Sequence, residues 1–340
     1  MKAAIMGAGS LGTIAGALIT KNGGDVVLID ANKEHVEALN KNGATVTGKM
    51  QLNVPVRAIT PDRMEGTYDI VLYMVKQTHN EQALRSLLPH LHDRSVVCVM
   101  QNGVPEEAVA ACVGKERVVG CAVGWGATWL KPGVSELTSE VAKMTLDVGE
   151  LEGHSSWRVQ MAADILRKIC PTEITENLQG IRWSKLLINA TFSGMSAVLG
   201  CTYGDILENE KALTCAAVIA NEIIAVARGL GVILEPIQGV DLQILAFRNK
   251  TEMMGKFPIY QAVFGPHRLL KASMLQDLEK GLKTEIGAIN GVVCEKGRKV
   301  AVATPVNDTV VEIVTGIEAG KYRPVFRNID LFKLPQIPEK

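Results

Sequence analysis

The sequence predicts two domains of different class, an α/β domain built on a parallel sheet and an all-helical domain after it. Three observations predict this. The chain opens with a strand, a glycine turn, a helix and a second strand, and its first half then alternates short apolar runs with helical stretches. In the second half, long helical periodicity replaces the strand-like runs. With 340 residues, 47% of them hydrophobic and 21% charged, the chain is long enough for two hydrophobic cores.

The first element is the apolar run Ala3–Met6, which leads directly into the glycine pattern Gly7-Ala-Gly-Ser-Leu-Gly12. A helical stretch follows to Lys21, and a second apolar run, residues 26–30, comes after a pair of glycines. A strand, a glycine turn, a helix and a second strand that ends in an acid are typical of the Rossmann-type unit that binds a dinucleotide. The alternative is an ordinary glycine turn in another α/β protein.

Each glycine of this pattern has a mechanical reason. Gly7 permits the tight turn out of the strand, Gly9 lets the backbone approach a pyrophosphate because it has no Cβ, and Gly12 lets the helix lie close to the sheet. The start of the helix then offers backbone N–H groups to the phosphates. The cofactor-binding residues expected in this segment are Gly7, Gly9, Ser10, Leu11 and Gly12.

Asp30 bears on which dinucleotide binds. It ends the second strand, at the position where a carboxylate accepts hydrogen bonds from the ribose hydroxyls and repels a 2′-phosphate. We therefore expect NAD(H) to be favoured over NADP(H), with Lys33 nearby as a partial offset. The alternative role for Asp30 is to cap the helix expected over residues 32–40, and the two roles are compatible.

The rest of the first half predicts further strands and helices. The apolar runs are rich in Val and Ile, which is typical of strands buried on both faces of a parallel sheet. Residues 137–151 predict one or two more strands, and a polar stretch with Pro and Gly near residues 171–180 predicts the domain boundary. The expected strands are residues 54–59, 68–75, 95–100 and 117–123, and the expected helices are residues 80–91 and Glu106–Val113.

The second half predicts at least three long helices. Residues 212–230 form an apolar helix that Gly231 closes, and residues 273–297 carry apolar side chains at steps of three and four, as one buried helix face does. Thr304 and Pro305 predict a capped start of the last helix, which runs to about Glu318. The predicted organisation is a dinucleotide-binding domain over residues 1–175, a helical substrate and dimerisation domain over residues 176–325, and a tail over residues 326–340.

Composition excludes several classes of function. The formal net charge is zero and no basic run is interleaved with aromatic residues, which argues against nucleic-acid binding. No apolar stretch reaches the roughly 18 residues of a membrane span. The seven cysteines are scattered without a CxxC pair, so neither a metal site nor a disulfide framework is expected. Because Met1-Lys2 leads directly into the first strand, we expect no signal peptide and a cytoplasmic enzyme.

Polar residues follow two of the expected strands. Lys76 comes after Met74-Val75, and Gln101-Asn102-Gly103 comes after Val99-Met100. In open α/β sheets the ligand lies beyond the carboxyl ends of the strands, so Lys76 and Asn102 are expected to face the cofactor, and Asn102 the substrate as well. The alternative is that they are ordinary polar loop residues.

The second domain offers a polar stripe in an apolar segment. Lys185, Asn189 and Ser193 repeat every four residues, which places them on one face of a helix. A lysine in such surroundings needs a partner or a task, unless its chain extends to solvent. Glu285 flanks the apolar stripe of its own expected helix. A carboxylate and an ammonium facing a shared cleft would form an acid/base pair.

These motifs together resemble the ketopantoate reductase (2-dehydropantoate 2-reductase) family. The resemblance extends from Gly7 to about Glu318 and includes four motifs in the family's order. It implies a helical domain like that of 6-phosphogluconate dehydrogenase, with the active site between the domains. The four motifs are Gly7-Ala-Gly-Ser-Leu-Gly12, Gln101-Asn-Gly103, Lys185-Leu-Leu-Ile-Asn189, and Ser273-Met-Leu-Gln-Asp277 leading to Thr284-Glu285-Ile286.

The resemblance also implies roles. Lys185 would be the catalytic acid that protonates the C2 carbonyl oxygen as hydride arrives, and Glu285 would hold the substrate hydroxyl region and orient Lys185. Asn189 and Ser273 would bind polar groups of the substrate, with Ser193 in the place of a further amide. Hydride transfer to a 2-oxo acid builds negative charge on the carbonyl oxygen, and an ammonium there both stabilises that charge and supplies the proton.

Four positions depart from the family pattern. Ser193 stands where an asparagine is usual, Gly194 where a proline is usual, His79 where a glutamine is frequent, and Asp30 where a basic residue selects NADP. The leading expectation is reduction of ketopantoate to pantoate by a homodimeric enzyme. The alternatives are the same chemistry on a different 2-oxo acid, a 3-hydroxyacid or sugar-acid dehydrogenase, and a catalytically silent dinucleotide sensor.

Overall fold

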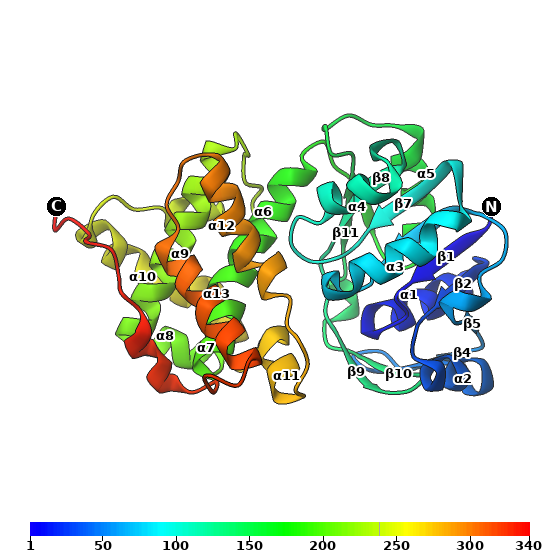
Figure 1. Cartoon of the computed structure of the whole chain (residues 1–340), viewed down its shortest axis with the longest axis horizontal. Coiled ribbons are helices and arrows are strands. Elements are labelled where there is room, and N and C mark those ends of the chain that lie inside the picture. Colours follow the sequence, from blue (N-terminus) through cyan, green and yellow to red (C-terminus); the bar gives the residue numbers. More distant parts are fainter. Residues whose placement is uncertain (238) are drawn as a thin grey trace. The chain divides into compact units, whose positions relative to one another are not determined.

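The computed structural model describes residues 1–237 and 239–340. The chain forms two compact units, shown in Figure 1. The first comprises residues 1–101 and 105–178, and the second comprises residues 102–104 and 179–340. The first unit is a mixed α/β domain and the second is helical, so the predicted fold class is confirmed.

An eight-stranded sheet forms the centre of the first unit. The strand that opens the chain lies inside it and pairs in parallel with the second strand, Ala3 opposite Val26, and with a later strand, Ala3 opposite Ile70. The strands in spatial order are β12 (Thr172–Ile174), β11 (Leu146–Gly149), β8 (Val118–Val123), β7 (Leu91–Val99), β6 (Tyr68–Tyr73), β1 (Ala3–Met6), β2 (Val26–Ile29) and β5 (Arg57–Ile59). The sheet is mainly parallel, but β11 is antiparallel to β8.

Helices accompany this sheet, and four of the five were predicted; α5, over Trp157–Leu166, was not. The expected helix over residues 32–40 is present, and Asn32 caps it by accepting a hydrogen bond from the His35 backbone N–H. The prediction for residues 80–91 was too long, because the helix ends at Leu87 and strand β7 already begins at Leu91. The helices are α1 (Ser10–Lys21), α2 (Lys33–Asn42), α3 (Asn80–Leu87), α4 (Glu106–Val113) and α5 (Trp157–Leu166).

A second, four-stranded sheet was not anticipated. The single strand expected over residues 54–59 is two strands in two sheets, and Pro55, which has no N–H to donate, stands between them. This sheet packs on α1 through one face, while its edge strand leaves Trp129 and Leu130 exposed. Its strands in order are β4 (Leu52–Val54), β3 (Ala44–Gly48), β10 (Val134–Leu137) and β9 (Ala127–Lys131).

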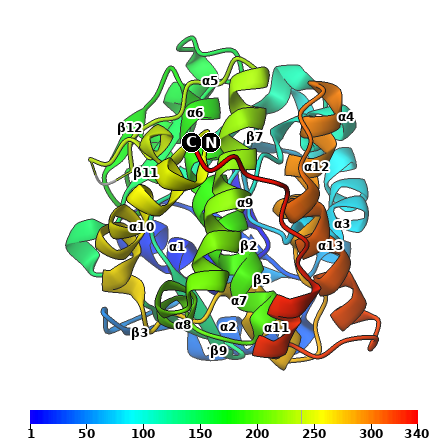
Figure 2. The same ribbon diagram turned by 90° about the vertical axis from the view of Figure 1, so that its left-hand side faces the viewer.

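The second unit is built around one long helix, α9 (Glu210–Gly229), and Figure 2 shows α12 and α13 beside it. This helix is long and apolar enough to cross a membrane, contrary to the expectation that no segment would be, but 72% of its most apolar window is buried inside the structure. The core helix of a globular domain has these properties. The other helices are α6 (Leu178–Ile188), α7 (Gly194–Leu199), α8 (Tyr203–Glu208), α10 (Lys250–Phe264), α11 (Ser273–Glu279), α12 (Asn290–Lys299) and α13 (Pro305–Glu318).

The prediction of one helix over residues 273–297 was wrong. The chain forms α11, a loop, a short 3₁₀ turn over Ile286–Ala288, and then α12. Gly281 takes a positive φ of 67° after α11, a conformation that ends a helix. Thr284 then anchors the loop, because its backbone N–H and its hydroxyl both donate to Glu318 Oε1, at 2.7 and 2.6 Å. Helical periodicity in the sequence therefore continued across a real break.

The start of α13 also differs from its prediction. Thr304 occupies the capping position, but its side chain accepts no hydrogen bond from the first turn. Instead the carboxylate of Glu222, from α9, accepts the backbone N–H groups of Val306 and Asn307, each at 3.0 Å. The cap of this helix therefore comes from a residue distant in sequence.

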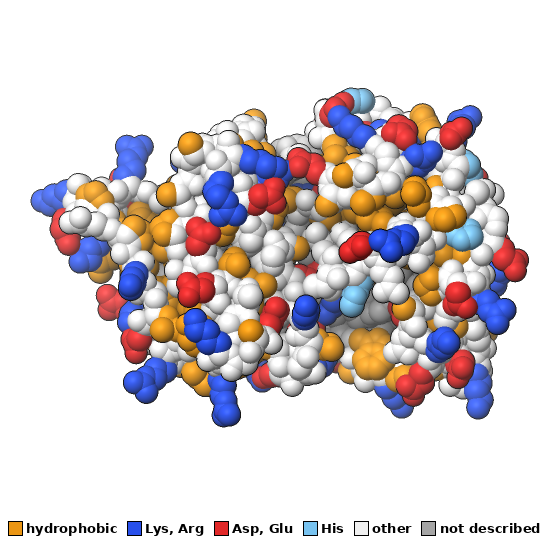
Figure 3. Space-filling model, viewed as in Figure 1, with side chains coloured by type: hydrophobic (Ala, Val, Ile, Leu, Met, Phe, Trp, Pro, Cys, Tyr) orange, Lys and Arg blue, Asp and Glu red, His pale blue; other side chains and the backbone are white. Residues whose placement is uncertain are grey.

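The charged side chains show no segregation on the face drawn in Figure 3. Lysine and arginine are interspersed with aspartate and glutamate there, in keeping with the formal net charge of zero. Such a face lacks the single-sign field that attracts polyanions.

Candidate functional site

The glycine turn of the first unit has the geometry that a close helix–strand approach requires. Gly7 has a φ of 95°, and a Cβ on it would lie 2.6 Å from the backbone nitrogen of Val75. A Cβ on Gly12 would lie 2.3 Å from the carbonyl oxygen of Gly7. Both positions therefore require glycine, the first for backbone conformation and the second because α1 begins against the turn itself.

The start of α1 fits the pyrophosphate of a dinucleotide. Gly9 is the capping residue of this helix, and no side chain makes a capping hydrogen bond there. A Cβ built on Gly9 would meet no atom within 4 Å, so the backbone is open on that side. The backbone N–H groups at Ser10 and Leu11, both half-buried, belong to the first turn, where N–H groups have no partner inside the helix. These groups suit the oxygens of a phosphate.

Asp30 lies half-buried at the carboxyl end of β2. Its Oδ1 accepts the backbone N–H of Asn32 at 2.9 Å, and the cap of α2 is Asn32 itself. The alternative role considered for Asp30, that of capping α2, therefore belongs to Asn32. Asp30 shapes the turn between strand and helix instead.

A buried histidine that the sequence analysis missed supports the glycine turn. His35 is 1% exposed, and its Nδ1 accepts the backbone N–H of Gly133 at 2.9 Å. Its Nε2 lies 2.7 Å from the carbonyl oxygen of Ala8, inside the glycine pattern. Because a backbone N–H always donates and a carbonyl always accepts, the ring is the neutral Nε2–H tautomer. The available signal was its place among the apolar residues Val36 and Leu39 on α2.

We expect His35→Phe to weaken dinucleotide binding by about tenfold and to lower the melting temperature. The substitution keeps a ring of similar size but leaves the Gly133 N–H without its acceptor and removes one donor from the Ala8 carbonyl, a loss of about 1–3 kcal/mol. The measurement is the Kd for the reduced dinucleotide by fluorescence titration, with thermal melts alongside.

The matched control is His90→Phe, which removes a single ring–carbonyl bond, to Gly66, outside the glycine turn. This variant should bind the dinucleotide as the wild type does. An unchanged Kd for His35→Phe, with the protein folded, would show that the glycine turn keeps its shape without the histidine.

The strand ends carry the two polar positions predicted. Lys76 is exposed directly beyond β6, and Asn102 is half-buried beyond β7. The buried Gln101, which directly precedes Asn102, donates from Nε2 to the carbonyl oxygen of Val75. The same Nε2 donates to Asn80 Oδ1 at 2.7 Å. Gln101 therefore ties the end of β7 to the segment after β6, a linking role that its position in the motif did not reveal.

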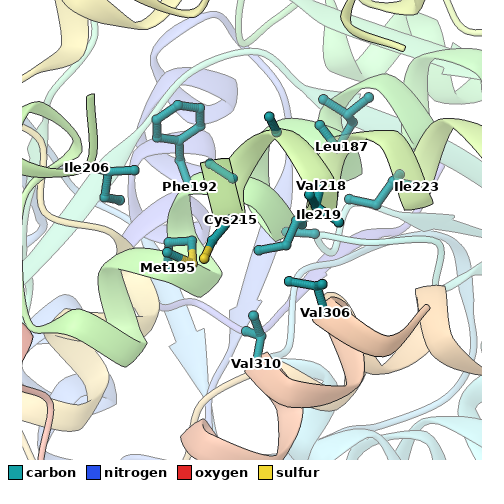
Figure 4. Packing of buried hydrophobic residues seen from close by; sticks show 14 of the residues in the cluster. Leu187, Phe192, Met195, Ile206, Cys215, Val218, Ile219, Ile223, Val306 and Val310 are labelled. Atoms are coloured by element: carbon teal, nitrogen blue, oxygen red, sulfur yellow. The ribbon is translucent and has the colours of Figure 1, made fainter. Parts of the chain in front are cut away.

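In the second unit, the polar residues lie on a helix whose other side chains form the core. Figure 4 shows Leu187 and Phe192 within one cluster of buried hydrophobic residues that also contains Ile219 of α9 and Val306 of α13. Lys185 on α6 and Asn189 directly after it are half-buried, one helical turn apart. The predicted pairing of these two residues on adjacent turns is therefore present in the structure.

Ser193 does not continue the regular stripe. Residues Asn189–Ser193 form a π-helical turn between α6 and α7, in which the hydrogen bonds span one more residue than in an α-helix. The prediction of one uninterrupted α-helical face is wrong at this point. The Ser193 hydroxyl is buried and lies 3.1 Å from the hydroxyl of Tyr203, whose pKa is raised by burial.

The remaining predicted residues lie in two other segments of the second unit. Glu285 is half-buried in the loop before the 3₁₀ turn, where its carbonyl oxygen accepts the backbone N–H groups of Ala288 and Ile289. Ser273 is exposed at the first position of α11. Among the described residues, no group of three or more His, Cys, Asp or Glu side chains could hold a metal ion.

Comparisons with known proteins match both parts of the chain. The family described as ketopantoate reductase PanE/ApbA matches residues 3–153, and its C-terminal counterpart matches residues 177–318. A 2-dehydropantoate 2-reductase of Archaeoglobus fulgidus is 30% identical over 317 residues, which cover 93% of this chain and 97% of that protein.

Two solved structures have similar folds. A PanE/ApbA family ketopantoate reductase of Ralstonia eutropha is 25% identical, with a TM-score of 0.80 over 94% of this chain and 99% of that one. A D-mandelate dehydrogenase in complex with NADH and anilino(oxo)acetate is 24% identical, with a TM-score of 0.81 over the same shares of the two chains. At that identity, the second likeness bears on the fold alone.

Proposed function

Since the chain belongs to the ketopantoate reductase family, we propose that it transfers a hydride between a nicotinamide dinucleotide and a 2-oxo acid, and that it reduces 2-dehydropantoate to pantoate. The observation that carries the proposal is the placement of Lys185 and Asn189. Both are half-buried on adjacent turns of a largely buried helical segment, within the part of the chain that matches the C-terminal part of the family. An ammonium and an amide in that setting suit a carbonyl that gains negative charge.

Lys185 acts as the general acid in this proposal. The bound dinucleotide supplies the hydride. As negative charge grows on the C2 carbonyl oxygen, the Lys185 ammonium stabilises it and gives up a proton to it, so that an alcohol forms. The neighbours Leu186 and Leu187, both fully buried, pack into the core and fix the helix that carries Lys185.

The other predicted residues bind and orient. Glu285 holds the hydroxyl region of the substrate and orients Lys185, while Asn189 and Ser273 bind the substrate's polar groups. Asn102 and Lys76 contact the cofactor, and Asn102 the substrate as well. Ser193 shares its hydroxyl with Tyr203, so it offers the substrate less than the asparagine usual in the family.

We propose NAD(H) as the preferred cofactor, on the strength of Asp30. A carboxylate at the end of β2 accepts hydrogen bonds from the ribose hydroxyls and repels the 2′-phosphate of NADP(H). Because the cap of α2 is already supplied by Asn32, Asp30 retains hydrogen-bonding capacity for the ribose.

The test is the initial rate of 2-dehydropantoate reduction with NADH and with NADPH, followed by the absorbance of the reduced nicotinamide. We expect turnover with both and a kcat/KM at least about tenfold higher with NADH, the ratio that a difference of 1.4 kcal/mol produces. In Asp30→Asn, which has nearly the same shape without the charge, the preference should shrink.

Each other outcome selects an alternative. Turnover only with NADPH would leave the reaction in place and overturn the argument from Asp30. If the protein binds the dinucleotide but turns over only another 2-oxo acid, that acid replaces 2-dehydropantoate as the substrate. Ser193 and Gly194, which depart from the family pattern, would be the first residues to examine as the cause. Binding without turnover on any 2-oxo acid would point to a sensor.

A further inference from the structure

A chain of buried polar groups ends at the π-helical turn that carries Asn189. Asn290, the first residue of α12, is fully buried, and its Nδ2 donates to the carbonyl oxygen of Ala190 at 3.0 Å. The same Nδ2 donates to Asn307 Oδ1 at 2.9 Å. One amide therefore links the π turn to α13.

The chain continues from α13 to α9. Asn307 is fully buried, and its Nδ2 donates to Glu222 Oε2 at 2.7 Å. The carboxylate of Glu222 also accepts the backbone N–H groups of Val306 and Asn307. Burial holds the pKa of the Glu222 carboxyl above its usual range, and these three N–H donors offset only part of that rise.

The direction of every bond in this chain is fixed. Backbone N–H groups only donate, so the carboxylate of Glu222 is held as an acceptor, and Asn307 must turn its NH₂ group towards it. The Asn307 oxygen then faces Asn290, whose NH₂ group must donate to it. The same NH₂ group of Asn290 also donates to the carbonyl oxygen of Ala190, which only this orientation of the amide allows.

The π turn depends on such support. A π-helical turn interrupts the regular ladder of backbone hydrogen bonds, and such turns are frequent at functional sites. Phe192 anchors the turn on its apolar side, with its ring centroid 4.1 Å from that of Phe264. Ala190 is fully buried, and Asn290 supplies the polar anchor.

Gly194 leaves the room that this anchor needs. It is the first residue after the π turn, and a Cβ on it would lie 2.8 Å from Asn290 Oδ1 and 3.0 Å from Val310 Cγ1. A larger residue there, such as the proline usual in the family, would displace the Asn290 amide. The glycine at position 194 and the position of the Asn290 amide are therefore matched.

We propose that Asn290 is a positioning residue: through its bonds to Ala190 and Asn307 it holds the π turn so that Asn189 and Lys185 meet the substrate. The inference rests on the proposed function, in which these two residues act on a 2-oxo acid. Asn189 directly precedes the anchored Ala190, and Lys185 lies one turn earlier on α6. A shift of the turn therefore moves the amide and the ammonium relative to the substrate.

The experiment replaces Asn290 by aspartate, which has the same shape but turns the NH₂ donor into an oxygen. We expect kcat/KM for 2-dehydropantoate to fall at least tenfold in Asn290→Asp, through a lower kcat together with a higher KM, because a misplaced acid slows chemistry and a misplaced amide weakens binding. The Kd for the dinucleotide alone should stay within about twofold of wild type, since the glycine turn belongs to the other unit.

The chain offers a matched control in Asn328, which is also buried. Its Nδ2 donates to two carbonyl oxygens, Val198 at 2.8 Å and Arg323 at 2.7 Å, and Val198 lies in α7, after the π turn. Asn328→Asp removes the same kind of donor from the same unit. We expect it to lower the melting temperature and to leave kcat/KM within about twofold of wild type.

The outcomes separate the two proposals. Two results would overturn the positioning role: a folded Asn290→Asp variant with wild-type kcat/KM, or a fall in kcat/KM of equal size in Asn328→Asp. Neither result affects the proposed function as long as the wild-type protein turns over the 2-oxo acid. Absence of wild-type turnover on any 2-oxo acid overturns both. If Asn290→Asp does not fold, Asn290→Ser takes its place, because its hydroxyl can donate one hydrogen bond. The expectation is the same: a lower kcat/KM for 2-dehydropantoate and an unchanged Kd for the dinucleotide.

Discussion

Lys185→Ala is expected to lower kcat for reduction of the 2-oxo acid by about 10²- to 10⁴-fold, the usual contribution of a positioned general acid. The variant loses both the proton and the positive charge opposite the developing alkoxide. Because Lys185 belongs to the second unit and the glycine turn to the first, the Kd for the dinucleotide should change little. Single-turnover rates with saturating dinucleotide measure the effect without interference from product release.

Two further variants make this result specific. Lys185→Arg keeps the charge, but the guanidinium does not give up a proton, so a large loss in this variant separates proton donation from charge stabilisation. Lys211→Ala removes an exposed lysine of α9 that pairs with Asp330 at 2.7 Å, and it should leave kcat unchanged. Retention of wild-type kcat in Lys185→Ala would contradict the assigned mechanism.

Two features of the candidate site could be predicted from the sequence, the glycine turn and the polar residues beyond the strand ends. The glycine turn could be recognised because its glycines occur at a fixed spacing between a strand and a helix, and a Cβ on Gly12 would meet the carbonyl oxygen of Gly7 within the turn itself. The polar residues after β6 and β7 could be recognised because all parallel strands of such a sheet end at one edge. The first pattern lies within a dozen consecutive residues, and the second follows from the general topology of parallel sheets.

The supporting contacts could not be predicted, since they join segments far apart in the chain. His35 bonds Gly133 across 98 positions, and Asn290 bonds Ala190 across 100. Apolar neighbours can suggest that His35 is buried, but they do not reveal its distant partner. The helical periodicity around Asn290 predicted a longer helix instead of the break before it. The π turn was missed because the four-residue spacing of Lys185, Asn189 and Ser193 is also the spacing expected on an α-helix.

The second sheet shows a different limit. Its strands are short, and Pro55 separates β4 from β5 within what looked like one apolar run. β3 alternates buried and half-buried residues as a strand covered on one face does, but five residues are too few to distinguish that pattern from a loop. The strands of this sheet pair across distant segments, since β3 pairs with β10, and the sheet packs on α1.

Glu222→Gln is expected to cause the largest loss of stability among the substitutions considered, about 3 kcal/mol in the free energy of unfolding. The carboxylate offers acceptors to three N–H donors, from Val306 and from the backbone and side chain of Asn307. A glutamine amide retains one acceptor and turns an NH₂ group towards the remaining donors. Each buried donor left without an acceptor costs about 1–3 kcal/mol, and loss of the helix cap adds to this.

Chemical denaturation measures this loss, and Glu295→Gln provides the control. Glu295 is also a glutamate of the second unit, but it is exposed and pairs with Lys299 on its own helix, so its substitution should change the free energy of unfolding by less than about 0.5 kcal/mol. Because Glu222 holds Asn307, which in turn bonds Asn290, we also expect Glu222→Gln to lower kcat/KM at temperatures where the protein is folded. A destabilised variant with wild-type kcat/KM would mean that the carboxylate only caps α13, and that the Asn290 amide keeps the π turn in place without it.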